Sequence, residues 1–172
     1  MHSGPLRGRL NDPASFLWRW ELAGHPREPA AWRALHEFAA TAFPKAGAAF
    51  SDLHVSLVEA AVQDDAALAT RSAQIEALTQ QGRYPSGPVV PAAARAFAAF
   101  ERGDAGITMQ LLEPFIETLE RIGGSHAQLD LIRLTLVKAC LAAGRPDEAR
   151  RFWDQRFPHG GGAPVGGFDG MH

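Results

Sequence analysis

Cysteine is nearly absent from this sequence, since Cys140 is the only one among 172 residues. A single thiol excludes an internal disulfide and any zinc site built from several cysteines. It also fits a reducing compartment. Because Ala139, Leu141 and Ala142 surround it in the sequence, we expect Cys140 to be an unreactive thiol of the core.

An excess of charge and long apolar runs are lacking as well. The formal net charge is -2, so there is no basic surplus to attract nucleic acid or an anionic membrane. No stretch approaches the roughly 18 consecutive apolar residues of a membrane-spanning helix, and no apolar run of the secretory type follows the N-terminus. These absences predict a soluble, cytoplasmic protein that binds neither nucleic acid nor membrane.

Signals for β-strands are scarce too, because only residues 88–90 suggest an extended segment. Alanine-rich patterns of helical period fill most of the chain and are interrupted by glycine, proline and aspartate. Eight helices are predicted, at residues 13–23, 29–42, 48–62, 65–81, 91–102, 104–122, 126–143 and 146–157. Asp12 is the expected cap of the first helix.

The turns between paired helices recur at a nearly constant period. They are spaced by 40, 39 and 41 residues and lie at Gly24, Asp64, Gly103 and Gly144. Small or short side chains follow the last three turns by five positions, at Ala69, Thr108 and Ala149. This period predicts an all-α fold, an α-solenoid of about four antiparallel helix-turn-helix hairpins that resemble tetratricopeptide repeats (TPRs), with an ordinary helical bundle as the alternative.

The composition divides the chain into three parts. Residues 1–9 are predicted to be a flexible N-terminus, and residues 10–157 to be the TPR-like helical repeat domain. Residues 158–172 are dominated by glycine and proline and can bury little. They are predicted to be a disordered tail.

Four segments in the same order carry a family resemblance. They read NDPASFLWRWEL (11–22), FSDLHVSLVEAA (50–61), AFAAFERGDAGITMQLLEP (96–114) and IGGSHAQLDLI (122–132). Together they resemble the C-terminal half of the tetratricopeptide repeat protein 38 family, over about residues 10–157. The resemblance implies a helical-repeat fold and points to no reaction, cofactor or ligand. Because that family has further repeats ahead of this region, the chain is a fragment, a late start or a truncated paralogue on this view.

The last of these segments places a serine, a histidine and an aspartate close together. Gly123 is expected to end one helix with a positive φ. Ser125 and Gln128 fit a capping box at the start of the next helix, and Asp130 is favoured there by the helix dipole. His126 directly follows Ser125, and adjacent residues at a helix start point apart. A helix stop and start is therefore predicted, without a nucleophile and its base.

A second polar set lies within residues 50–61. On a helix, one face carries Phe50, His54, Leu57 and Ala61, and another carries Asp52, Ser56 and Glu59. Asp52 and His54 are two residues apart and do not face each other. A histidine in an apolar stripe is usually satisfied within the core. The alternative is that this face lines the concave groove of the solenoid.

These observations favour a protein-interaction module or scaffold that binds a protein or peptide partner. The inner surface formed by the first helices of the hairpins is the expected binding surface, with Asp52, His54, Arg95, His126 and Asp130 as candidate contacts. No catalytic residue, cofactor or metal is predicted. The alternative is a small-molecule-binding or catalytic subunit with a pocket near His54 or His126.

Aromatic residues of the first hairpin suggest a further interface. Phe16 and Trp20 share one helical face, while Trp18 shares another with Leu22. Each solenoid unit buries its face on the next, so a first hairpin without a neighbour on one side would expose part of its aromatic surface. We therefore expect a homo-oligomer or partner contact through Phe16, Trp18, Trp20 and Trp32.

Overall fold

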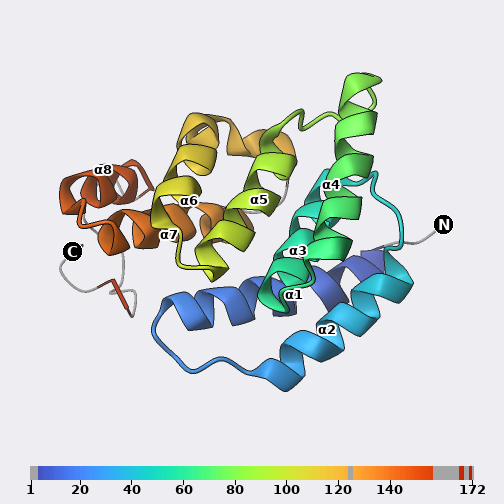
Figure 1. Cartoon of the computed structure of the whole chain (residues 1–172), viewed down its shortest axis with the longest axis horizontal. Helices are drawn as coiled ribbons and strands as arrows, with labels where there is room; N and C mark the ends of the chain where they lie inside the picture. The colour runs from blue at the N-terminus through green and yellow to red at the C-terminus, as the bar shows by residue number, and fades with distance from the viewer. Residues whose placement is uncertain (1–3, 124–125, 157–166, 169–170, 172) are drawn as a thin grey trace.

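The computed structural model describes residues 4–123, 126–156, 167, 168 and 171. In this part of the chain all regular structure is helical and no strand occurs, which confirms the all-α prediction (Figure 1). The elements are α1 (Gly4–Leu22), α2 (Pro29–Ala42), α3 (Ala49–Ala61), α4 (Asp65–Gln80), α5 (Val89–Glu101), α6 (Ala105–Leu112), the 3₁₀ segment η1 (Glu113–Ile122), α7 (His126–Ala142) and α8 (Pro146–Arg156). None of the described helices has the length and apolar character needed to cross a bilayer.

The turns inside the hairpins share a geometry that explains their period. A residue with positive φ ends the first helix of each of the last three hairpins, namely Gln63 (φ 59°), Gly103 (φ 77°) and Gly144 (φ 70°). Asp64 and Asp104 then cap α4 and α6, because each accepts a hydrogen bond from the amide three residues later, at 2.9 and 3.0 Å. The described chain is thus a TPR-like array of helical hairpins.

In the second hairpin Asp64 lies between α3 and α4 as predicted, but the residue with positive φ comes one position earlier. Gln63, and not Asp64, occupies the position of Gly103 and Gly144. Five residues later comes Leu68, which is buried, whereas Ala69 is exposed. The prediction for Ala69 is therefore wrong, while Thr108 and Ala149 are buried as expected.

The first helix begins nine residues earlier than predicted, so residues 4–9 are helical and Asp12 is not its cap. Pro13 lies inside the helix, where it removes one backbone hydrogen bond. Leu10, Ala14 and Trp18 nevertheless follow one another at intervals of four residues, and all three are buried. Burial of this stripe outweighs the local cost of the proline, as packing supplies most helical stability in proteins.

Two other boundaries differ from the prediction because of prolines. The helix expected at residues 104–122 ends at Leu112 and continues as η1 from Glu113. Pro114, at the start of η1, cannot donate the next helical hydrogen bond. Residues 89 and 90, expected to be extended, form the first turn of α5 after Pro88.

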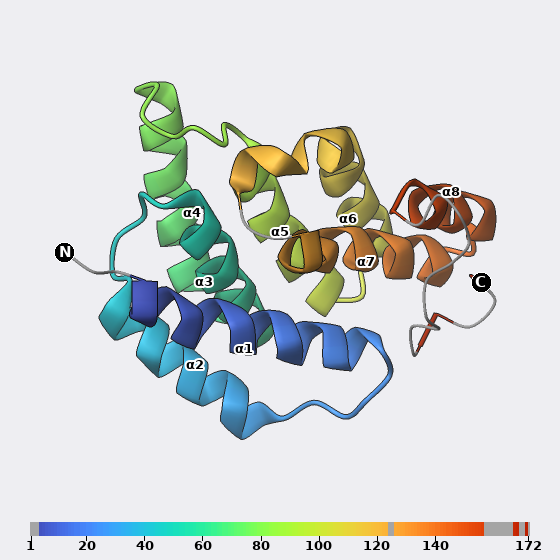
Figure 2. The same ribbon diagram turned by 180° about the vertical axis from the view of Figure 1, so that it is seen from behind.

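Helix α1 fills the inner side of the hairpin array. Figures 1 and 2 show it running lengthwise beneath α3 and α7, and it packs against both. Trp18 extends the contact to α5, with ring centroids 5.5 Å from Phe97 and 5.6 Å from Phe100. Its Nε1 donates to Thr135 Oγ1 of α7 at 2.8 Å. The surface on which a partner was expected is therefore covered by a helix of the same chain.

Most of the predicted tail, residues 158–172, lies outside the described residues. At two described positions the structure differs from the expectation that this segment buries little, since Phe168 and Met171 are both buried. The Phe168 ring lies 5.4 Å from that of Trp153, and the Lys138 ammonium sits 4.5 Å from the Phe168 centroid. Phe168 therefore adds to the core beside the last hairpin.

Candidate functional site

His54 is a satisfied core histidine. Its Nδ1 lies 2.7 Å from the Phe50 carbonyl, and its Nε2 lies 2.8 Å from Ser15 Oγ. A carbonyl only accepts, so Nδ1 carries the proton and Nε2 accepts from the Ser15 hydroxyl. Both side chains are buried, and burial lowers the pKa of His54 to about 4. The pair has the atoms of a nucleophile and its base, but no substrate can reach it.

The burial of His54 predicts that stability falls with acidification. Below pH 6.5 the unfolded chain binds a proton at His54, whereas the native chain does so only near pH 4. Unfolding therefore becomes easier across this window, by up to about 3 kcal/mol. Urea denaturation between these limits checks the trend, and His54→Gln is expected to remove this component. A native-state titration of His54 near 6.5 would contradict it.

Asp52 is held within the protein rather than presented to a partner. Its Oδ2 accepts from the amides of Gly47 and Ala48 and from the Tyr84 hydroxyl, each at 2.9 Å. These amides precede the first turn of α3, where a negative charge is favoured. Burial and the neighbouring Asp52 carboxylate raise the pKa of the Tyr84 phenol. The Asp52 side chain thus anchors the start of α3.

Arg71 of α4 connects this carboxylate with another on α3. Its three polar groups donate to Glu59 Oε1 at 3.0 Å, to Asp52 Oδ1 at 3.1 Å and to the Phe43 carbonyl at 2.7 Å. The side chains of Asp52, Glu59, Arg71 and Tyr84 are all buried. We call Asp52, Glu59, Arg71 and Tyr84 the Arg71 cluster. Two buried carboxylates and one guanidinium leave it with an excess of negative charge when both acids are ionised.

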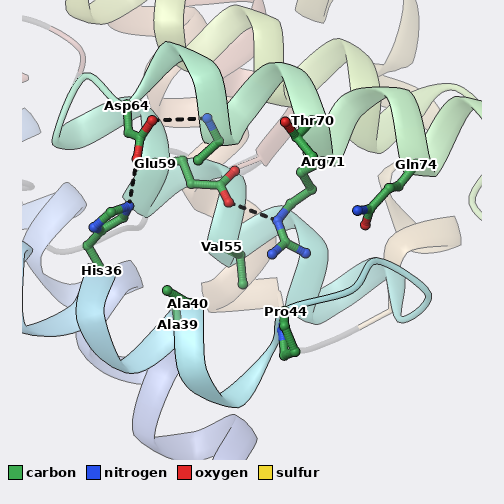
Figure 3. Close-up of a pocket in the computed structure, with 11 residues that line it drawn as sticks. His36, Ala39, Ala40, Pro44, Val55, Glu59, Asp64, Thr70, Arg71 and Gln74 are labelled. Carbon is green, nitrogen blue, oxygen red and sulfur yellow. Dashed lines mark hydrogen bonds and ion pairs between the residues drawn. The ribbon is translucent and has the colours of Figure 1, made fainter.

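A pocket of about 280 Å³ opens beside the cluster, between α2, α3 and α4 (Figure 3). We call it the Glu59 pocket; it is lined by His36, Ala39, Ala40, Pro44, Val55, Glu59, Asp64, Ala67, Thr70, Arg71 and Gln74. At its half-buried edge His36 Nε2 lies 3.2 Å from Asp64 Oδ2. Glu59 is only 5% exposed, and its Oε2 has no hydrogen-bond partner. Burial raises the pKa of this carboxyl.

The other candidate contacts are not gathered around one surface with Asp52 and His54. Arg95 is exposed on α5 and pairs with Glu76 of α4 at 2.8 Å. Asp130 is half-buried on α7. The side chain of His126 lies outside the described part of the structure. The internal bonds of Asp52 and His54 leave no free surface for a partner at these two positions.

The predicted stop and start at residues 123–128 are confirmed only in part. Gly123 has a φ of 79° and α7 begins at His126, as expected. Ser125 and the side chain of Gln128 lie outside the described residues, so the capping box stays a prediction.

Cys140 is buried, and burial raises its pKa to about 11. Among the described residues, no group of three His, Cys, Asp or Glu side chains is placed to hold a metal ion.

The N-terminal hairpin corrects part of the predicted aromatic interface. Trp18 and Trp32 are each only 1% exposed, and their rings pack edge to face with centroids 6.4 Å apart. Phe16 and Trp20 are 56% and 37% exposed, and the interface predicted at these residues stays a prediction. A mostly apolar groove of about 410 Å³ separates α1 and α2 on this outer side. This α1/α2 groove is lined by Arg9, Pro13, Phe16, Leu17, Ala31, Ala34, Leu35 and Phe38.

Glu59 was expected on the polar face of its helix but was not among the predicted site residues. Its spacing from Asp52 and Ser56 was the available signal, because three polar residues on one face of an otherwise apolar helix need partners. The partner of Asp52 and Glu59 is Arg71, which lies in the next helix.

Comparison with known proteins adds one match. A family model described as tetratricopeptide repeat matches residues 131–155, which span α7 from Leu131 and most of α8. Neither the curated proteins nor the solved structures gave a match. The last hairpin is therefore similar to a tetratricopeptide repeat, and the part of the chain that the structure describes is all-helical and TPR-like.

Proposed function

We propose that this chain is a protein-interaction module that binds an apolar helical segment of a partner in the α1/α2 groove. The observation that carries the proposal is the exposure of Phe16 beside this groove. Large exposed apolar side chains around a groove mark interaction sites, and an amphipathic helix is a common ligand of such grooves. The likeness of the last hairpin to a tetratricopeptide repeat supports the same class of function.

The chemistry of the groove limits what would bind there. Phe38 and Leu35 of α2 face Leu17 and Phe16 of α1, so its walls are apolar on both sides. Arg9 lies over the Phe38 ring, 5.0 Å from its centroid, and supplies one positive charge at the edge. A partner helix with apolar residues at every third or fourth position and an acidic residue at one end fits this surface.

Photocrosslinking tests the proposal. A benzophenone amino acid at Phe16 is expected to crosslink a partner in an extract of the native cells, and the same group at Ile107 is not. Ile107 is the matched control because it is an apolar residue of α6 that is 44% exposed. Phe16→Ser should then weaken binding of the identified partner by about tenfold.

The crosslinked products and the binding of Phe16→Ser decide whether the α1/α2 groove binds a partner. A different polypeptide crosslinked at Phe16 supports the proposal. A covalent dimer of this chain instead supports self-association through the groove. Identical products at both positions, or unchanged binding by Phe16→Ser, would rule out the groove as the binding site.

Membership of the tetratricopeptide repeat protein 38 family and a cytoplasmic location stay predictions.

A further inference from the structure

We propose that the Glu59 pocket binds a primary alkylammonium group, with the positive end beside the Glu59 carboxylate and the alkyl stem against the apolar part of the lining. This site is separate from the α1/α2 groove, because His36, Ala39 and Ala40 present a different side of α2 from Leu35 and Phe38. The inference therefore goes beyond the proposed function and does not depend on it.

The unpaired oxygen is the starting point. Glu59 is buried, and Oε1 is the atom that receives the Arg71 Nε hydrogen bond. The other two nitrogens of Arg71 donate to Asp52 and to the Phe43 carbonyl. Each of the three guanidinium nitrogens therefore already donates one hydrogen bond. Among the described residues no donor reaches Glu59 Oε2. A buried carboxylate oxygen without a donor is costly, and a positive charge beside this carboxylate would offset part of that cost.

The charges around the pocket favour a cation over an anion. The pocket is lined by two carboxylates, of Glu59 and Asp64, and by one guanidinium, that of Arg71, which is also paired with Asp52 behind the pocket. His36 pairs with Asp64 at the edge and is the remaining titratable group beside Glu59. With His36 neutral, the formal sum is negative. An anionic ligand would add another like charge to this surface.

The donor set favours an organic cation over a metal ion. Calcium and magnesium require six or more oxygen ligands, whereas the pocket offers one unpaired buried oxygen, on Glu59. Ala39, Pro44 and Val55 give the lining an apolar part that suits a short methylene chain. A volume of about 280 Å³ accommodates a group the size of a lysine side chain.

The test is an amide chemical-shift titration of the whole chain with n-butylammonium, and with n-butanol as the neutral analogue. A pH of about 8 keeps the amine charged and favours the ionised form of Glu59, whose pKa is raised. We expect saturable shifts at Ala39, Val55 and Glu59 with a Kd of about 1 mM. If n-butanol caused shifts as large as those from n-butylammonium, the positive charge would not contribute to binding. That result alone would overturn the proposal.

A matched pair of variants locates the site. Glu59→Gln keeps an oxygen for Arg71 but removes the charge, and it is expected to weaken butylammonium binding by about tenfold or more. Glu76→Gln is the control, because Glu76 is an exposed acid of α4 outside the pocket. Equal binding by wild type and Glu59→Gln, or equal weakening by both variants, would contradict the assignment.

Two sources of the ammonium are distinguished by a capped Gly-Lys-Gly peptide and its norleucine counterpart. Binding of the lysine peptide, but not of the norleucine peptide, identifies a lysine side chain of a protein as the ligand. Binding of butylammonium alone identifies a free amine. Phe16→Ser should bind either cation as wild type does, so failure of the α1/α2 groove proposal is seen separately.

Discussion

Replacing Arg71 with alanine is expected to lower the free energy of unfolding by about 3–5 kcal/mol, because it leaves two buried carboxylates without their common partner. Asp52 and Glu59 bond this guanidinium at 3.1 and 3.0 Å, and all three side chains are buried. The loss should shrink as pH falls, since protonation removes the uncompensated charges and burial already raises the pKa of Glu59. Urea denaturation at several pH values measures both effects.

The matched control for this prediction is Arg95→Ala. Arg95 also forms an ion pair with a glutamate, but its pair with Glu76 is about half exposed on both sides. Exposed pairs contribute about 0–1 kcal/mol. If the two alanine variants lost similar amounts of stability, the Arg71 cluster would not be a buried, mutually dependent group.

Replacing Trp18 with alanine is expected to cost about 3–5 kcal/mol as well. The indole is 1% exposed and contacts the rings of Phe97 and Phe100 on α5 and of Trp32 on α2. Its Nε1 also donates to Thr135 on α7. For a chain of this length the melting temperature should fall by roughly 10 °C. Thermal unfolding followed by circular dichroism measures this change.

Trp20→Ala separates the two faces of the same helix. Trp20 is 37% exposed, and its ring stacks on His25 with centroids 3.6 Å apart. Surface substitutions of this kind change stability by about 0.5 kcal/mol. A larger loss from Trp20 than from Trp18 would mean that the opposite face of α1 is the buried one.

Helix positions and turn spacings were accessible from the sequence because they depend on local signals. The bounds of α2 were predicted correctly from Pro29 and Pro44, and the starts of α7 and α8 at His126 and Pro146 were also correct. The positive φ at Gln63 was not predicted because glutamine carries no sequence signal for this conformation. The early start of α1 was missed because Leu10 is stabilised by distant contacts that local patterns do not reveal.

The arrangement of the helices was less accessible because it depends on residues far apart in the chain. Two aromatic faces of α1 were visible in the sequence, but neither the pattern nor the propensities decide that Trp18 packs inward and Phe16 outward. The same applies to the candidate site. The polar face of α3 that carries Asp52 and Glu59 was visible, whereas their shared partner Arg71 lies 19 and 12 residues away on α4.

Helix α1 fills the inner side of the hairpin array, where it packs against α3 and α7, so the proposed partner groove lies on the outer side. The most direct test is a nuclear Overhauser effect between the indole NH of Trp18 and the methyl group of Thr135. The hydrogen bond of 2.8 Å between these side chains predicts a strong cross-peak in the native protein. Assigned resonances without this cross-peak, together with a Trp18 indole NH that exchanges as fast as that of Trp20, would contradict the claim.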